Sequence, residues 1–171
     1  MTSALVLIDL QNDYFPGGAM ELVEPEAAVE RAALLLRTFR ERGWPVVHVQ
    51  HVSTRAGATF FLPDTLGVRI HAAVAPAAGE AVVTKHFPNG FRGTTLQETL
   101  CSAGASTLVL AGMMTHMCVD TTVRAAADAG FECRLAHDAC ATRSLAFAGV
   151  TVAARDVQTA YLAALNGSFA R

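Results

Sequence analysis

Short apolar segments alternate with segments of helical periodicity along most of the chain, and this alternation limits the folds available to it. The apolar segments predict strands over residues 3–10, 45–51, 81–84, 106–111 and 131–136. The segments between them predict helices over residues 25–42, 118–129 and 151–165, with a shorter one that Thr94 or Thr95 caps and that runs to Leu100. Strands that are apolar throughout are typical of parallel sheets covered by helices on both faces. We therefore expect one three-layer α/β/α domain over residues 1–171 with a mainly parallel central sheet.

The segment over residues 52–79 is the main interruption of this pattern. Glycine and proline break it repeatedly, and a connection of this length is usually functional or an interaction loop. Its Phe60–Phe61 pair could contribute to a pocket or to a subunit contact. Because a monomer seldom leaves so many apolar side chains on a long connection, the loop favours a homo-oligomer. The alternative is that the loop folds back over its own sheet edge.

Composition excludes several classes of partner. A formal net charge of −2 gives no basic surface for nucleic acid. The longest apolar runs are far shorter than the roughly 20 residues that span a bilayer. The run Ala4–Ile8 has no basic stretch before it, so it predicts a strand and not a signal peptide. The four cysteines contain no C-x-x-C pair and fit neither a zinc site nor a disulfide scaffold, which favours a cytoplasmic protein.

Three chemically capable side chains sit at predicted strand ends: Asp9, Lys85 and Cys118. The carboxyl ends of parallel strands share one edge, so these residues can converge there. Cys118 falls in the first turn of a helix, where free N–H groups and the helix dipole favour a thiolate. A carboxylate can take the thiol proton and a lysine can stabilise the resulting anions. Each also has an ordinary interpretation: a capping aspartate, a surface lysine and a small buried cysteine.

If the three groups act together, Cys118 should be alkylated by iodoacetamide before the other thiols. The other thiols are Cys101, Cys133 and Cys140.

Three blocks of sequence resemble the signature blocks of the isochorismatase-like hydrolases. They are LVLIDLQNDYF at 5–15, VVTKHFPNGFRGT at 82–94 and LAGMMTHMCVDTTVRAAADAGF at 110–131. The resemblance runs from about residue 3 to 165 and implies that family's α/β/α fold of Rossmann-like topology. It also implies a catalytic triad of Cys118, Asp9 and Lys85. A cis peptide at Met113–Met114 is implied as well, with the backbone N–H groups of Met114 and Cys118 forming an oxyanion hole.

The resemblance implies a reaction class but not a substrate. Nicotinamidase-like relatives carry a metal site with an Asp-x-His pair after the second strand, whereas this chain has His48 and His51 there without an aspartate. Residues three apart on a strand face opposite ways, so we expect no metal and no cofactor. The presence of Cys118 favours hydrolysis of C–N bonds in amides, carbamoyl or ureido compounds. The alternatives are a vinyl-ether hydrolase of the isochorismatase type that uses Asp9, and an inactive member that serves binding or assembly.

Further residues are candidates for substrate binding. Five aromatic side chains could form an apolar pocket wall: Tyr14, Phe15, Phe60, Phe87 and Phe91. His116, beside the nucleophile, could also contact the substrate. A Cys–His dyad with His116 is a less favoured alternative, because residues two apart at a turn seldom reach that geometry. Three arginines could bind an anionic substrate or simply face solvent: Arg55, Arg92 and Arg143. Members of the family are commonly dimers or tetramers, which adds to the expectation of a homo-oligomer.

Overall fold

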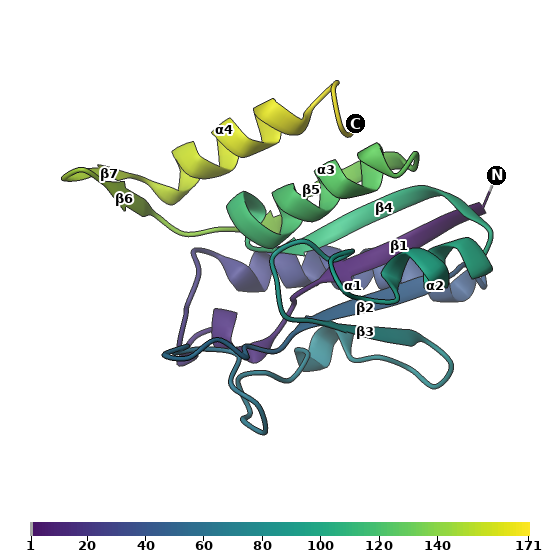
Figure 1. Ribbon diagram of the computed structural model, residues 1–171, viewed down its shortest axis with the longest axis horizontal. Helices are drawn as coiled ribbons and strands as arrows, with labels where there is room; N and C mark the ends of the chain where they lie inside the picture. Colours follow the sequence, from purple (N-terminus) through teal and green to yellow (C-terminus); the bar gives the residue numbers. More distant parts are fainter. Residues whose placement is uncertain (1) are drawn as a thin grey trace.

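A five-stranded sheet in the order β3–β2–β1–β4–β5 forms the middle layer of the protein (Figure 1). The computed structural model describes residues 2–171, so Met1, which the predicted domain includes, lies outside the described residues. The strands are β1 Thr2–Ile8, β2 Val46–His51, β3 Ala81–Lys85, β4 Ala105–Met113 and β5 Glu132–Ala141. All four neighbouring pairs are parallel. The predicted α/β/α fold with a parallel sheet is confirmed.

Helices cover both faces of this sheet because the side chains of each strand alternate between two cores. The helices are α1 Pro25–Glu41, α2 Leu96–Ser102, α3 Asp120–Asp128 and α4 Ala154–Leu165, with short 3-10 turns η1 Asn12–Tyr14 and η2 Ala72–Val74. In β1, Leu5 and Leu7 pack in the core beneath α1, which lies behind the sheet in Figure 1. The alternate residues Ala4, Val6 and Ile8 pack in the opposite core with α2 and α3.

The carboxyl-terminal third differs from the prediction. Strand β5 continues through residues 137–141, which the sequence predicts as a loop. The pairing of β4 with β5 shifts in register between Leu110 and Gly112, so the polar His137–Asp138 stretch is accommodated as an irregularity within the strand. The predicted last helix begins at residue 151, but residues 151–152 belong to a hairpin of β6 Leu145–Phe147 and β7 Val150–Val152, and α4 begins at Ala154. Ala148 and Gly149 both have positive φ, as a two-residue hairpin turn requires.

The long loop over residues 52–79 folds back onto its own sheet edge. Phe61 is 0% exposed and Val68 is 7% exposed, so both belong to the core. The Gln11 side-chain amide donates to the carbonyl oxygens of His51 at 2.8 Å and of Val68 at 2.7 Å, which ties the loop to the end of β1. Gly67 approaches Asp13 so closely that a Cβ there would lie 2.0 Å from a carboxylate oxygen. The loop therefore completes the monomer, and its Phe61 is not a subunit contact.

Within residues 2–171, no helix is both long and apolar enough to cross a membrane.

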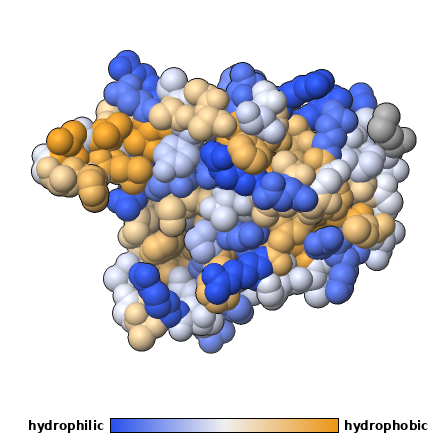
Figure 2. Space-filling model, turned by 45° about the horizontal axis from the view of Figure 1, so that its top comes forward, coloured by the Kyte–Doolittle hydropathy of each residue, from blue (hydrophilic) through white to orange (hydrophobic). Residues whose placement is uncertain are grey.

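The most exposed of the large apolar side chains described lies elsewhere, on the β6–β7 hairpin. Phe147 is 86% exposed, and Val150 and Val152 are also exposed. The hairpin projects from the body of the molecule, and it forms the orange protrusion at the left of Figure 2. A protruding apolar surface of this kind is typical of an interaction site.

We propose that this hairpin is a contact between copies of the chain in a homo-oligomer. Light scattering at micromolar concentration should then give a multiple of the 18.0 kDa chain mass, and Phe147→Ser should shift it toward the monomer. The matched control is Leu66→Ser, which removes an exposed apolar side chain from the long loop and should leave the mass unchanged. A wild-type monomer would refute the oligomer, and dissociation by Leu66→Ser alone would place the contact on the loop.

A network of charged side chains holds α1 against the segment before β3. Arg40 on α1 donates from Nε to Glu80 Oε1 at 2.7 Å and from Nη2 to Oε2 at 2.8 Å. His48 Nε2 on β2 lies 2.8 Å from the same Oε2. The hydrogen bonds from Arg40 are the main reason that the pKa of Glu80 is lowered to about 2.

Glu80→Gln should lower the free energy of unfolding at pH 7 by about 1–3 kcal/mol, measured by urea denaturation. The folded pKa lies below the ordinary value of about 4.3, so the stabilisation is complete above that value and is lost as pH falls toward about 2. The difference between the two proteins should therefore shrink between about pH 4.3 and about pH 2. Asp156→Asn, whose ion pair with Arg155 is exposed, should change little. A difference that is independent of pH would contradict the ionic origin.

Candidate active site

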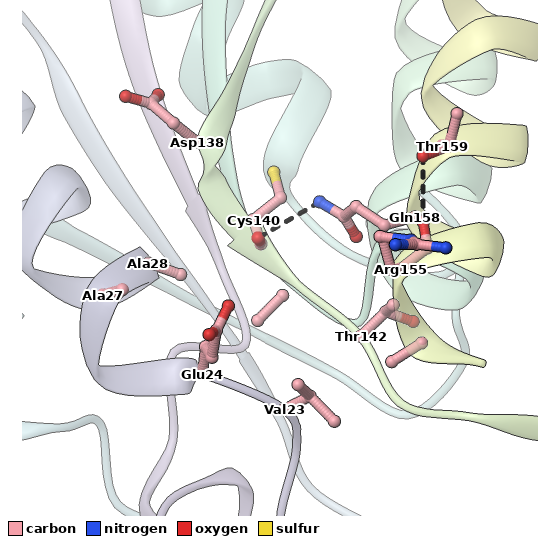
Figure 3. Close-up of a pocket in the computed structure, with 12 residues that line it drawn as sticks. Val23, Glu24, Ala27, Ala28, Asp138, Cys140, Thr142, Arg155, Gln158 and Thr159 are labelled. Atoms are coloured by element: carbon pink, nitrogen blue, oxygen red, sulfur yellow. Dashed lines mark hydrogen bonds between the residues drawn. The ribbon is translucent and has the colours of Figure 1, made fainter.

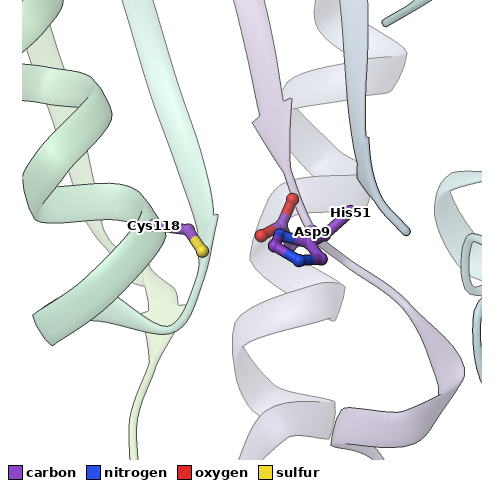
Figure 4. Close-up of side chains that lie close together, drawn as sticks. All are labelled: Asp9, His51 and Cys118. Atoms are coloured by element: carbon purple, nitrogen blue, oxygen red, sulfur yellow. The ribbon is translucent and has the colours of Figure 1, made fainter. Parts of the chain in front are cut away.

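Four neighbouring strands each bring one polar side chain to the same edge of the sheet. These are Lys85 at the end of β3, His51 at the end of β2, Asp9 directly after β1, and Cys118 beyond β4. Figure 4 shows Asp9 and His51 side by side, with the sulfur of Cys118 turned toward them. The three predicted residues Asp9, Lys85 and Cys118 are therefore brought together, and His51 joins them.

Close packing of β1 and β4 makes this convergence possible. At Gly112 a Cβ would lie 2.0 Å from the carbonyl oxygen of Ile8, so only glycine fits where β4 passes the end of β1. Asp9, the residue after Ile8, has a φ of 51° and donates its backbone N–H to Val49 O at 2.9 Å. This left-handed conformation is uncommon for a residue other than glycine. It turns the chain out of the strand at the residue that carries the carboxylate.

Lys85 is the centre of the cluster. Its ammonium nitrogen donates to Asp9 Oδ2 at 2.7 Å and to Cys118 Sγ at 3.2 Å, and it lies 2.8 Å from His51 Nδ1. Asp9 and Lys85 are 0% exposed and Cys118 is 5% exposed. Burial opposes the charge on Lys85, but Asp9 and Cys118 outweigh it and raise the lysine pKa. The amine is therefore a permanent cation at neutral pH and cannot serve as a base.

The resting state of Cys118 differs from the sequence expectation. Burial, and next the charge of Asp9, raise the pKa of the Cys118 thiol well above its ordinary range, although Lys85 opposes this. The cysteine lies in a single π-helical turn, η3 Thr115–Val119, that precedes α3. The residue is thus at the start of the helical segment as predicted, but it rests as a thiol. Sequence reasoning missed this because the spacing of residues does not reveal burial.

His51 is the member of the cluster that the sequence analysis did not predict. Its side chain contacts Lys85, whereas the side chain of His48 contacts Glu80, so the two histidine side chains lie in different surroundings. Burial and then the charge of Lys85 lower the pKa of His51 to about 4. The ring is therefore neutral at neutral pH, and Nδ1 can accept a hydrogen bond from the ammonium. The available signal was its position at the end of a strand next to the strand of Lys85.

Asp9, His51 and Cys118 each present one possible ligand atom, and these atoms lie within 4.8 Å of one another. Such a group could in principle hold a metal ion. Here the Lys85 ammonium contacts an atom of each residue and so places a positive charge among them. The Lys85 ammonium would repel a metal ion at this position, so the ion could bind only by displacing it.

The predicted aromatic residues are distributed unequally around the cluster. Tyr14 is buried, and burial is the main reason that its pKa is raised. Its ring lies 4.7 Å from that of Phe61 and 6.0 Å from that of Phe60. These three rings form an aromatic wall close to the cluster.

The other predicted residues have their own partners. Phe15 stacks on His71, Arg92 lies over the exposed ring of Phe87, Phe91 packs near Phe131, and His116 contacts Thr142 and Tyr161. His116 Nδ1 lies 2.5 Å from Thr142 Oγ1, so this nitrogen faces the end of β5.

A cavity of about 320 Å³ lies away from the cluster (Figure 3). The start of α1, the end of β5 and α4 line it, and Gln158 spans it by donating to Cys140 O at 3.2 Å. None of Asp9, Lys85, His51 and Cys118 borders this cavity.

The peptide bond Met113–Met114 is cis, at the position that the resemblance implies. The carbonyl of Met114 accepts from the N–H groups of Met117 at 3.0 Å and Val119 at 3.2 Å. Met114 therefore begins the turn that carries Cys118, and the two residues lie on the same short segment between β4 and α3.

Comparison with known proteins gives consistent results over the whole chain. The Isochorismatase domain family matches residues 3–166. The chain is 49% identical over 170 residues to the uncharacterized isochorismatase family protein YddQ of Bacillus subtilis, covering 99% of this chain and 94% of that protein. It is 33% identical to the maleamate amidohydrolase of Pseudomonas putida, covering 75% of this chain and 67% of that protein. A crystal structure from Oleispira antarctica, assigned to the isochorismatase hydrolases, superposes with a TM-score of 0.96 at 51% identity, covering 99% and 91%.

The buried, protonated state of Cys118 gives a testable order of thiol reactivity. Under native conditions iodoacetamide should modify the exposed Cys101 before Cys118, because Cys118 is both shielded and poor in thiolate. Mass spectrometry of the digested protein over time reports the order, and denatured protein serves as the control in which all thiols react. Modification of Cys118 ahead of Cys101 would restore the original expectation of a primed thiolate.

Proposed function

Because the chain belongs to the isochorismatase family of hydrolases, we propose that it is a cysteine hydrolase that cleaves a C–N bond in a small amide, carbamoyl or ureido substrate. The observation that carries this proposal is the buried Lys85 ammonium, which contacts Asp9 and Cys118 at the same time. A nucleophile, a carboxylate and a fixed cation in contact are the parts that acyl transfer requires.

Asp9 is the base in this mechanism. Its Oδ2 accepts from Lys85, whereas Oδ1 is buried and has no hydrogen-bond partner among residues 2–171. An unpartnered carboxylate oxygen in a dry site is costly, and a transferable proton would satisfy it. We assign the thiol proton of Cys118 to this oxygen as the sulfur attacks the substrate carbonyl.

The remaining steps follow from the same groups. The new C–S bond converts the carbonyl oxygen to an oxyanion, which the backbone N–H groups of Met114 and Cys118 would stabilise. Protonated Asp9 gives its proton to the departing nitrogen as the C–N bond breaks, leaving a thioester. Water then gives a proton to Asp9 and attacks the thioester carbonyl. As the C–S bond breaks, Asp9 returns that proton to the sulfur, which releases the acid and restores the thiol. Lys85 remains charged throughout and offsets the negative charge on sulfur and carboxylate.

The surroundings favour a small substrate. Tyr14, Phe60 and Phe61 form an aromatic wall beside a cluster that is almost closed to solvent. The amidohydrolase relative supports an acyl compound with a nitrogen leaving group.

The test is turnover of a panel of small primary amides, carbamoyl acids and ureido acids, with ammonia release as the measurement. Cys118→Ala, Asp9→Asn and Lys85→Met should each lower kcat/KM by about 1000-fold or more, because the three groups act as a unit. Cys101→Ala makes the same chemical change at an exposed thiol and should leave turnover unchanged.

Two results would reject the proposal. Retained turnover in Cys118→Ala with loss in Asp9→Asn would indicate the vinyl-ether type of reaction through the carboxylate. Absence of turnover of all C–N substrates and of an isochorismate-like acid would indicate a binding role.

A further inference from the structure

We propose that His51 is a positioning residue for Lys85: its Nδ1 accepts a hydrogen bond from the third ammonium N–H and so holds the charge between Asp9 and Cys118. The kinetic consequence rests on the proposed function, whereas the contact itself rests on the geometry of β2 and β3.

An ammonium group has three N–H donors, and Lys85 has three contacts. Its nitrogen lies 2.7 Å from Asp9 Oδ2, 3.2 Å from Cys118 Sγ and 2.8 Å from His51 Nδ1. The side chain is 0% exposed, so no bulk solvent can replace a missing acceptor. Removal of the histidine nitrogen would leave one buried N–H of a charged group unsatisfied, which is a costly state.

His51 is held so that its ring can serve this purpose. It pairs with Lys85 in the register of β2 and β3. Its backbone N–H donates to Gln11 Oε1 at 2.8 Å, and its carbonyl accepts from Gln11 Nε2 at 2.8 Å. The ring of Phe61 lies 5.9 Å from the imidazole. The backbone is thus fixed on both sides, and a buried aromatic ring limits the space of the side chain.

The ionisation state of His51 agrees with an acceptor role. Burial and the neighbouring Lys85 lower its pKa to about 4, so the ring is neutral near pH 7. A neutral ring that accepts at Nδ1 carries its proton on Nε2.

The third contact decides where the ammonium points. Asp9 attracts the Lys85 ammonium more strongly than Cys118 does, because Asp9 is a charged carboxylate whereas the Cys118 thiol is neutral. Without His51 the ammonium would be free to turn toward the carboxylate and away from the sulfur. The thiolate formed during attack would then lose part of its stabilisation. We therefore expect a loss in kcat with little change in KM.

The kinetic experiment compares three variants. His51→Leu removes the acceptor, and His51→Asn keeps an acceptor near the position of Nδ1. His86→Leu removes an exposed histidine that follows Lys85 in the chain but does not contact its ammonium, so it is the matched control. With the most rapidly cleaved amide of the panel, His51→Leu should lower kcat by about 10- to 100-fold. His51→Asn should recover most of this loss, and His86→Leu should behave as wild type.

Nitrogen-15 NMR gives a readout that does not depend on activity, first on the wild-type protein and then on the His51 variants. His51 should appear as the neutral Nε2–H tautomer between about pH 6 and pH 8. The Lys85 ammonium should give a resonance protected from solvent exchange, which is lost in His51→Leu and retained in His51→Asn.

The outcomes separate this inference from the proposed function. If no amide is cleaved but the NMR signatures appear, His51 still positions Lys85 and only the reaction assignment fails. An Nδ1–H tautomer or a cationic ring in the wild-type protein would overturn the inference. A normal kcat in His51→Leu would also overturn it. A His51→Asn protein as slow as His51→Leu would do the same, because it would indicate that His51 acts by packing against Phe61.

Discussion

The buried ammonium of Lys85 is the interaction on which the rest of the site depends. A lysine without solvent access is stable as a cation only where its charge and its three donors are matched. Asp9 supplies the opposite charge, and Cys118 and His51 supply the other two contacts. Removing one partner of such a buried pair costs about 3–5 kcal/mol, whereas replacing the whole pair by apolar side chains is often neutral. The pair is thus poorly explained by stability, and a chemical role accounts for it better.

The parallel sheet is what allows these groups to meet. Four adjacent strands end at one edge, and each contributes one member of the cluster. The long loop completes the enclosure from the other side. The Asp13 carboxylate accepts from the backbone N–H of Phe61 at 2.6 Å and lies against Gly67, which fixes the ring of Phe61 beside Tyr14 and His51. Asp13 looks in sequence like an ordinary capping aspartate, but it links the end of β1 to the aromatic wall.

The sequence predicted the fold and the three strand-end residues because both follow from periodicity. An apolar strand followed by a helix indicates a parallel sheet, and a polar residue at its end indicates the shared edge. The contact of His51 could not be predicted in this way, because it depends on the side-chain direction of β2 and on the register with β3. The predicted last helix includes Thr151 and Val152, which the structure places in β7, and the turn at Ala148–Gly149 is only a weak sequence signal for the hairpin. The loop around Phe61 was open to both interpretations until its burial was known.

The raised pKa of Cys118 is compatible with a nucleophilic role once the charge of the whole cluster is considered. At rest the site holds one carboxylate, one ammonium and one thiol, with a net charge of zero. Loss of the thiol proton to solvent would leave a net negative charge in a buried site, and this is why the thiol pKa is raised. Transfer of the same proton to Asp9 Oδ1 leaves the net charge at zero, so the low dielectric does not oppose it. The thiol is therefore protected from reagents in solution, and it becomes a nucleophile only when a carbonyl is in place to accept the sulfur.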